Sequence, residues 1–135
     1  KHVRILGPER SATQIELAQT DCRNIGIKAP VRSSGDTKGT PGVTLRGPNG
    51  TLTVPEGVMI ADRHIHMTPA QAAAFGLADG DRVQVKIDGP KPGVMGGVLI
   101  RANDKCALDF HIDTDDGNAF LLKQGQLVTV LGKEE

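Results

Sequence analysis

Three of the four histidines in this chain fall in two short motifs that could bind a metal ion. His64-Ile65-His66 lies in an extended run, and side chains at positions i and i+2 of a strand project from the same face. His111 lies at a polar position of a second predicted strand. Imidazole is a good ligand for Zn²⁺ and related ions. The pattern therefore fits a metal site, while surface histidines held by hydrogen bonds are the alternative.

An internal repeat brings Glu16 into the same group. A shift of 50 residues superposes identical residues at five positions: Ile15 on Ile65, Gly26 on Gly76, Arg32 on Arg82, Gly39 on Gly89 and Gly47 on Gly97. The predicted order of strand, helix and glycine agrees between the two copies, which indicates a duplicated unit. The same shift aligns Glu16 with His66. Because equivalent positions of two packed copies can meet near a pseudo-twofold axis, Glu16 becomes a fourth candidate metal ligand.

Two segments could bind an anion. Arg10 follows a predicted turn at residues 7–9, and its guanidinium could hold phosphate through a bidentate pair of hydrogen bonds. Arg32-Ser33-Ser34-Gly35 combines a positive charge, two hydroxyls and accessible backbone N–H groups, which suits phosphate or pantetheine. A solvated arginine and an ordinary turn are the respective alternatives.

Other chemistries find less support in the sequence. Residues 113–118 resemble a calcium-binding loop but lack its length and terminal Glu, so Asp113 or Thr114 is predicted to cap a helix. No Gly-x-Ser-x-Gly motif occurs, and neither Cys22 nor Cys106 adjoins a histidine in the sequence. A covalent acyl-enzyme is therefore not expected.

The composition narrows the choice of partners. Of the 135 residues, 38% are hydrophobic and only 2% aromatic, so the core should be aliphatic and aromatic surfaces for base stacking are excluded. Lys+Arg and Asp+Glu both number 16, and a net charge of zero gives no long-range attraction for nucleic acid or anionic lipid. No long apolar stretch predicts a membrane span. Cys22 and Cys106 fit no disulfide framework and indicate reduced thiols in a cytoplasmic protein.

The candidate site residues lie on a succession of short predicted elements. Strands are expected at residues 3–6, 13–17, 42–46, 51–54, 57–66, 82–87, 93–101, 107–112 and 127–131, and helices at residues 20–25, 70–75 and 115–122. Asn49-Gly50 predicts a hairpin turn, and Thr68 with Gln71 predicts a helical capping box. Gly26 and Gly76 are expected to end helices. Many short strands with few small helices predict a mainly β fold built from barrels.

Five longer motifs make the sequence resemble the PduL-type phosphate propanoyltransferase family over essentially the whole chain. They are Leu6-Gly7-Pro8-Glu9-Arg10, Thr13-Gln14-Ile15-Glu16, Ala29-Pro30-Val31-Arg32-Ser33-Ser34-Gly35-Asp36, Ala61-Asp62-Arg63-His64-Ile65-His66-Met67-Thr68-Pro69, and His111-Ile112-Asp113-Thr114-Asp115 followed by Asn118. The resemblance implies two similar small β-barrels with short capping helices and a dinuclear metal site, usually zinc, between them. It also implies transfer of an acyl group between coenzyme A and inorganic phosphate, with propanoyl-CoA or acetyl-CoA as the substrate.

The resemblance also assigns roles to individual residues. Carried over by position, it implies that the zinc ligands are His64, His66, His111 and Glu16. Arg10 is implied to be the catalytic residue that binds phosphate, and Asn118 to line the site beside the metal. We expect phosphate to attack the thioester directly, without a protein nucleophile. Many relatives work inside bacterial microcompartments, so that location, partners among the shell or enclosed enzymes, and a homo-oligomer are further implications.

One departure from the family concerns the upstream region. The family has a further His-x-His and further strands before the position that matches Lys1. Residues 1–55 are therefore expected to form the C-terminal part of a first, incomplete barrel, and residues 56–132 a second barrel that contains the His64 motif. A complete family site is expected to hold two zinc ions. We expect the 135-residue chain by itself to bind at most one metal tightly.

Two other functions stay open. Residues 76–85 form a helix-end-to-strand pattern that also occurs in non-catalytic double-psi-like barrels, which bind a nucleotide or cofactor. The chain could also be an inactive fragment kept for assembly. Bound zinc together with turnover of acetyl-CoA would separate the enzyme from both.

Overall fold

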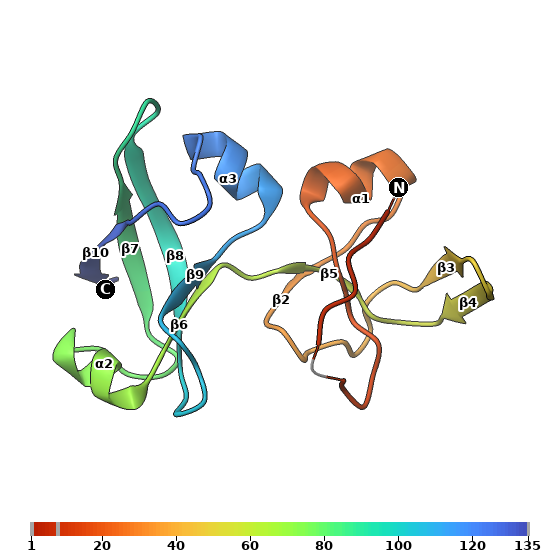
Figure 1. The fold of residues 1–135 in the computed structure, drawn as a ribbon, viewed down its shortest axis with the longest axis horizontal. Coiled ribbons are helices and arrows are strands. Elements are labelled where there is room, and N and C mark those ends of the chain that lie inside the picture. Colours follow the sequence, from red (N-terminus) through yellow and green to blue (C-terminus); the bar gives the residue numbers. More distant parts are fainter. Residues whose placement is uncertain (1, 8, 135) are drawn as a thin grey trace.

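The fold was obtained as a computed structural model, which describes residues 2–7 and 9–134 (Figure 1). Its strands are β1 (Ile15–Glu16), β2 (Val31–Arg32), β3 (Val43–Gly47), β4 (Gly50–Val54), β5 (Val58–Ala61), β6 (His64–Met67), β7 (Arg82–Ile87), β8 (Gly93–Ala102), β9 (Asp109–His111) and β10 (Thr129–Lys133). Its helices are α1 (Gln19–Ile25), α2 (Pro69–Ala74) and α3 (Thr114–Phe120). The chain is thus mainly β with a few short helices, as the sequence predicts. None of the helices in the described part has the length and apolar character needed to cross a membrane.

The local signals for turns and caps are confirmed. Thr68 accepts a hydrogen bond from the Gln71 N–H, and the Gln71 side chain accepts one from the Thr68 N–H, which completes the capping box of α2. Gly26 ends α1 in the left-handed conformation, with φ of 73°. Asn49-Gly50 joins β3 to β4 in a hairpin, with residues 43–47 paired to residues 50–54.

Two predicted strands are wrong. Residues 3–6 alternate in polarity but form no strand, and their apolar side chains are exposed, with Ile5 at 95%. The run at residues 57–66 is not one strand, because Asp62 and Arg63 separate β5 from β6. β5 pairs with β1 and β2, whereas β6 pairs with β8 and β9, so the run changes sheets at Asp62 and Arg63, where the Asp62 carboxylate accepts hydrogen bonds from Arg82.

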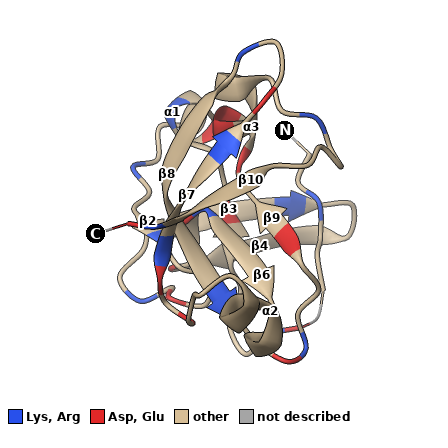
Figure 2. Cartoon of the chain, turned by 90° about the vertical axis from the view of Figure 1, so that its left-hand side faces the viewer, with Lys and Arg blue, Asp and Glu red and all other residues tan. Residues whose placement is uncertain are grey.

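The strands form sheets of three, five and two strands. In the five-stranded sheet the order is β10-β7-β8-β6-β9, with β6 parallel to β8 and antiparallel to β9. In the three-stranded sheet β5 lies between β1 and β2 and is parallel to both. Figure 1 shows the five-stranded sheet with α2 and α3 on one side of the molecule and α1 with β2–β5 on the other, joined where β5 runs into β6. Figure 2 shows basic and acidic residues interspersed over the elements, as expected for zero net charge.

The hydrophobic core orients the histidine strand. Its buried members are Ile65, Met67, Ala72, Leu77, Val83, Val85, Ile87, Met95, Val98 and Ile100. Because strand side chains alternate between faces, burying Ile65 and Met67 in this cluster turns His64 and His66 to the opposite face of β6. The aliphatic core thus determines which face of the sheet carries the imidazoles.

A close approach of backbones places β1, and with it Glu16. The Ile15 N–H donates to the Gly57 carbonyl at 2.8 Å, and the Leu17 N–H donates to the Met59 carbonyl at 2.9 Å. A Cβ on Gly57 would lie 2.4 Å from the Thr13 carbonyl oxygen, and Gly57 has a φ of 138°. Glycine is therefore required for β1 to lie against β5.

Candidate metal centre

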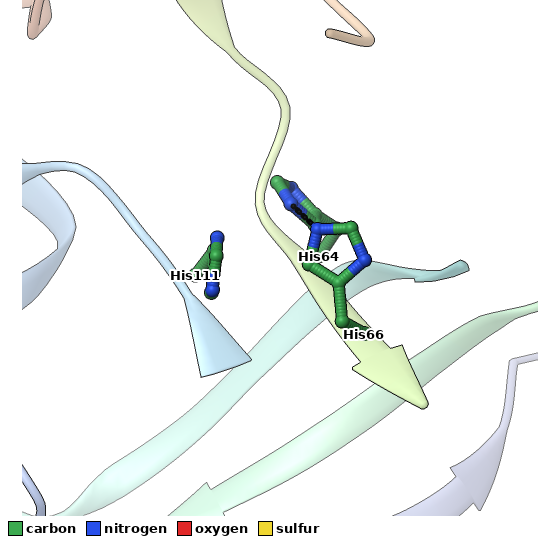
Figure 3. Close-up of side chains that lie close together, drawn as sticks. All are labelled: His64, His66 and His111. Atoms are coloured by element: carbon green, nitrogen blue, oxygen red, sulfur yellow. Dashed lines mark hydrogen bonds between the residues drawn. The ribbon is translucent and has the colours of Figure 1, made fainter. Parts of the chain in front are cut away.

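Three imidazoles converge on the face of the five-stranded sheet opposite the core (Figure 3). His64 and His111 are direct partners in the pairing of β6 with β9, and His66 lies two residues further along β6. One ring nitrogen from each histidine lies within 4.8 Å of the others. The three ring-centroid distances are 4.7, 4.9 and 5.0 Å. This spacing lets one cation be contacted by all three rings, as the two sequence motifs predict.

Partners on the outer side of His64 fix its orientation. Nδ1 of His64 lies 2.8 Å from the Asp62 carbonyl oxygen, which can only accept, so Nδ1 carries the proton. The Asp62 carboxylate in turn accepts from both terminal nitrogens of Arg82, at 3.3 and 2.6 Å. Arg82 also donates to the Gly97 carbonyl at 2.5 Å, which ties this segment to β8. With the proton on Nδ1, the neutral ring of His64 has a free lone pair on Nε2, and this lone pair points toward the other two histidines.

The electrostatic surroundings favour neutral imidazoles. Burial lowers the pKa of His64 below its usual 6.5, and the nearby His111 and Arg101 lower it further. The Asp62 carbonyl and the charge of Glu16 act in the opposite direction on this pKa. Burial, followed by the charges of His64, His111 and Arg101, also lowers the pKa of His66. Because a metal ligand must be the neutral ring, this donor set fits a divalent ion such as zinc.

Glu16 lines the same cleft as His64 and His111, which has a volume of about 460 Å³. Its carboxylate lies outside the compact group of three imidazoles and accepts a hydrogen bond from Gln14 Nε2 at 2.5 Å. The same Gln14 nitrogen lies 2.9 Å from Ser34 Oγ, and Gln14 Oε1 accepts from the Gly35 N–H at 2.7 Å. Gln14 therefore joins the candidate ligand Glu16 to the candidate anion loop.

Arg10 reaches the same loop. Its Nη1 would lie 4.0 Å from a Cβ placed on Gly35, so the guanidinium stands beside Ser34-Gly35. The backbone carbonyl of Ser33 accepts a hydrogen bond from the Asp36 N–H at 3.0 Å in the turn of this loop. Arg32 pairs with Asp36 at 3.4 Å, within the loop itself. Pro8, part of the motif that contains Arg10, lies outside the described residues.

Asn118 lies on α3 and lines a different, largely apolar cleft of about 760 Å³. This cleft is bordered by the core side of β6, at Ile65 and Met67, whereas Asp113 and Thr114 line both clefts. Asp113 accepts the Asp116 N–H at 2.8 Å and caps α3, which confirms the capping interpretation of residues 113–118.

Several contacts of the histidines were missed by the sequence analysis. Arg101 on β8 is the parallel partner of His66, and its charge contributes to the lowered pKa of both β6 histidines. Cys106 Sγ lies 3.2 Å from His66 Nδ1, although no cysteine adjoins a histidine in the sequence. Gln14, which contacts Glu16, could have been found from the sequence, because the 50-residue repeat aligns it with His64. No sequence pattern marks Arg101 or Cys106, since long-range pairing brings them beside His66.

Comparison with known proteins gives a consistent result along the chain. A family model described as phosphate propanoyltransferase matches residues 1–123. A phosphate propanoyltransferase from Thermotoga maritima is 46% identical over 132 residues, which cover 97% of this chain and 63% of the relative. One from Salmonella typhimurium is 48% identical over 120 residues, covering 88% and 57%, respectively. The chain thus spans somewhat less than two thirds of the length of these curated relatives.

Proposed function

The chain belongs to the phosphate propanoyltransferase family, and from this premise we propose that it supplies the metal-binding part of a phosphate acyltransferase active site. The observation that carries the proposal is the convergence of His64, His66 and His111 within 4.8 Å. The substrates would be a short acyl-CoA, propanoyl-CoA or acetyl-CoA, and inorganic phosphate. The products would be the acyl phosphate and coenzyme A.

The proposed reaction is a direct transfer. A phosphate oxygen attacks the thioester carbonyl carbon, the carbon–sulfur bond breaks, and coenzyme A leaves as the thiolate, which takes up the proton that the phosphate hydroxyl gives up. Arg10 would hold phosphate beside the Ser34-Gly35 loop through a charge-assisted pair of hydrogen bonds. A zinc ion held by the three histidines and Glu16 would polarise the thioester oxygen or stabilise the departing thiolate.

The remaining candidate residues are proposed to contact substrate. The Ser34 hydroxyl accepts a hydrogen bond from Gln14 and keeps its own proton to donate, and Ser34 directly precedes Gly35, beside which Arg10 lies. Arg32 and Ser33 lie in the same loop, which would receive phosphate or the pantetheine arm. Asn118 is proposed to contact substrate from the neighbouring cleft, whose wall it shares with Asp113 and Thr114.

The finer architecture and setting are also proposals. We place residues 1–55 in the C-terminal part of a first β-barrel and residues 56–132 in a second, with a second zinc ion held in part by the upstream His-x-His that the family resemblance implies. Residence in a bacterial microcompartment, contacts with its shell or enzymes, and homo-oligomer formation are expectations from the family resemblance.

The test compares metal content with turnover. The 135-residue chain, freed of metal and titrated with Zn²⁺, should bind one equivalent tightly. The same chain preceded by the His-x-His segment of a longer relative should bind a second equivalent and release coenzyme A thiol from acetyl-CoA or propanoyl-CoA when phosphate is present. Failure of both forms to bind zinc would refute the proposed site. Zinc binding without turnover in the extended form would favour the non-catalytic barrel module.

A further inference from the structure

The two histidines of β6 face each other through the same ring atom. Nε2 of His64 lies 3.1 Å from Nε2 of His66. Two lone pairs at this separation repel unless a proton or a cation lies between them. In His64 the proton is on Nδ1, because the Asp62 carbonyl oxygen, 2.8 Å from Nδ1, can only accept a hydrogen bond. The form of His66 therefore decides whether this pair makes an internal hydrogen bond or a metal site.

The partner of His66 on its outer side is Cys106. Its Sγ lies 3.2 Å from Nδ1 of His66, on the nitrogen that faces away from His64. A thiol can donate or accept, so it permits both forms of the ring. If the thiol donates, His66 carries its proton on Nε2 and bonds to His64. If the sulfur accepts, the proton moves to Nδ1 and both Nε2 lone pairs are free.

The position of Cys106 is built into the fold. The Asn103 N–H donates to the Met67 carbonyl at 2.9 Å, which attaches the loop after β8 to the end of β6. The Cys106 N–H donates to the Asn103 carbonyl at 3.0 Å, and Asn103 Oδ1 accepts the Lys105 N–H at 2.9 Å. The sulfur is thereby held beside His66 and outside the compact group of three imidazoles.

We propose that Cys106 is a positioning residue for His66: its sulfur accepts the Nδ1 proton and thereby directs the Nε2 lone pair at the bound metal. The Asp62 carbonyl has the same relation to His64, so both β6 histidines would use Nε2 as the ligand atom. The inference rests on the proposed metal site and adds to it a residue outside the set of ligands.

Zinc affinity provides the first test. The metal-free 135-residue chain is titrated with Zn²⁺ against a chromophoric chelator. Cys106→Ala should weaken zinc binding by about 10–100-fold, the usual effect of losing an outer partner of a ligand histidine. Cys106→Ser should stay within about threefold of the unmodified chain, because a hydroxyl also accepts. Lys105→Ala, in the same loop, should change nothing. Equal zinc affinity in Cys106→Ala would overturn the proposal while leaving the metal site intact.

Two spectroscopic readouts separate positioning from other roles. In the zinc-loaded unmodified chain, long-range ¹H–¹⁵N correlations should show His66 protonated at Nδ1, and ligation through Nδ1 would overturn the proposal. With Co²⁺, a thiolate-to-cobalt charge-transfer band that disappears in Cys106→Ser would make Cys106 itself a ligand and also overturn it. These readouts decide even if Cys106→Ala fails to fold. Absence of zinc binding by both the unmodified chain and the form extended by the upstream segment would remove the metal site and this inference together.

Discussion

His64 and His111 are direct antiparallel partners across β6 and β9, with 5.0 Å between their ring centroids. Strand register alone brings them together, since 47 positions separate them in the sequence. A one-residue slip of β9 would turn His111 to the opposite face of the sheet. Phe110, which pairs with Ile65 in the same register and packs against the core, opposes such a slip because the slip would turn its ring away from the core.

Removing one imidazole should abolish tight metal binding. We expect His111→Gln to weaken zinc affinity by more than the about 10–100-fold typical for loss of an outer partner, because a ligand itself is lost. Isothermal titration of the metal-free chain measures this directly. His2→Gln serves as the matched control, since His2 is exposed and lies far along the chain from β6. Equal affinities in the two variants would exclude His111 as a ligand.

Arg10 should act on phosphate use and leave folding unchanged. In the form extended by the upstream segment, Arg10→Ala should cost on the order of 2–4 kcal/mol of transition-state stabilisation, because a charge-assisted contact to a dianion is lost. Arg10→Lys should recover part of the rate, since an ammonium lacks the planar fork. The measurement is coenzyme A release as a function of phosphate concentration. Arg4→Ala is the control, and an unchanged phosphate dependence in Arg10→Ala would reject the assignment.

Gly57 should be indispensable for the placement of Glu16. Gly57→Ala introduces a Cβ 2.4 Å from the Thr13 carbonyl oxygen at a φ of 138°, so the backbone of β1 must move away from β5. We expect a loss of more than about 2 kcal/mol of unfolding free energy in urea, as for other strained backbone positions. Gly47→Ala is the matched control, because its Cβ would approach no atom closer than 3.9 Å. Similar unfolding free energies in both variants would contradict this account.

Local chemistry made much of the fold predictable. The capping box of Thr68 and Gln71, the Asn49-Gly50 turn and the β7 strand all follow from short-range patterns and are confirmed. Residues 3–6 show the limit of such patterns. Their alternation favours a strand, but pairing needs a neighbouring strand that no local signal supplies, and the segment is unpaired in the structure.

The candidate site was predictable to the extent that its residues share a strand or a motif. The spacing of His64 and His66 specifies one face of β6, whereas the approach of His111 required the β6–β9 pairing. Cys106 could not be predicted from sequence spacing, because 40 positions separate it from His66, whose imidazole it contacts. The turn at Asn103 and its bond to Met67 create that contact, and neither has a recognisable signature.

The lowered pKa values of His64 and His66 give a defined pH dependence of stability in the metal-free chain. Burial keeps both rings neutral in the folded state, while in the unfolded chain they titrate near 6.5. The unfolded state therefore binds more protons between the folded pKa values and 6.5, so the unfolding free energy rises with pH in that window. This stability is fully present above 6.5 and is lost as the pH falls through the folded pKa values.

Urea unfolding with excess chelator, from about pH 7.5 to about pH 5, measures this dependence across the histidine range. The double variant His64→Gln/His66→Gln should lose most of the slope, because the two rings whose pKa values are lowered are gone. His2→Gln should retain it. Contributions from carboxylates are common to all three proteins and cancel in the comparison. A slope that persists unchanged in the double variant would show that other groups, and not His64 and His66, couple protonation to unfolding.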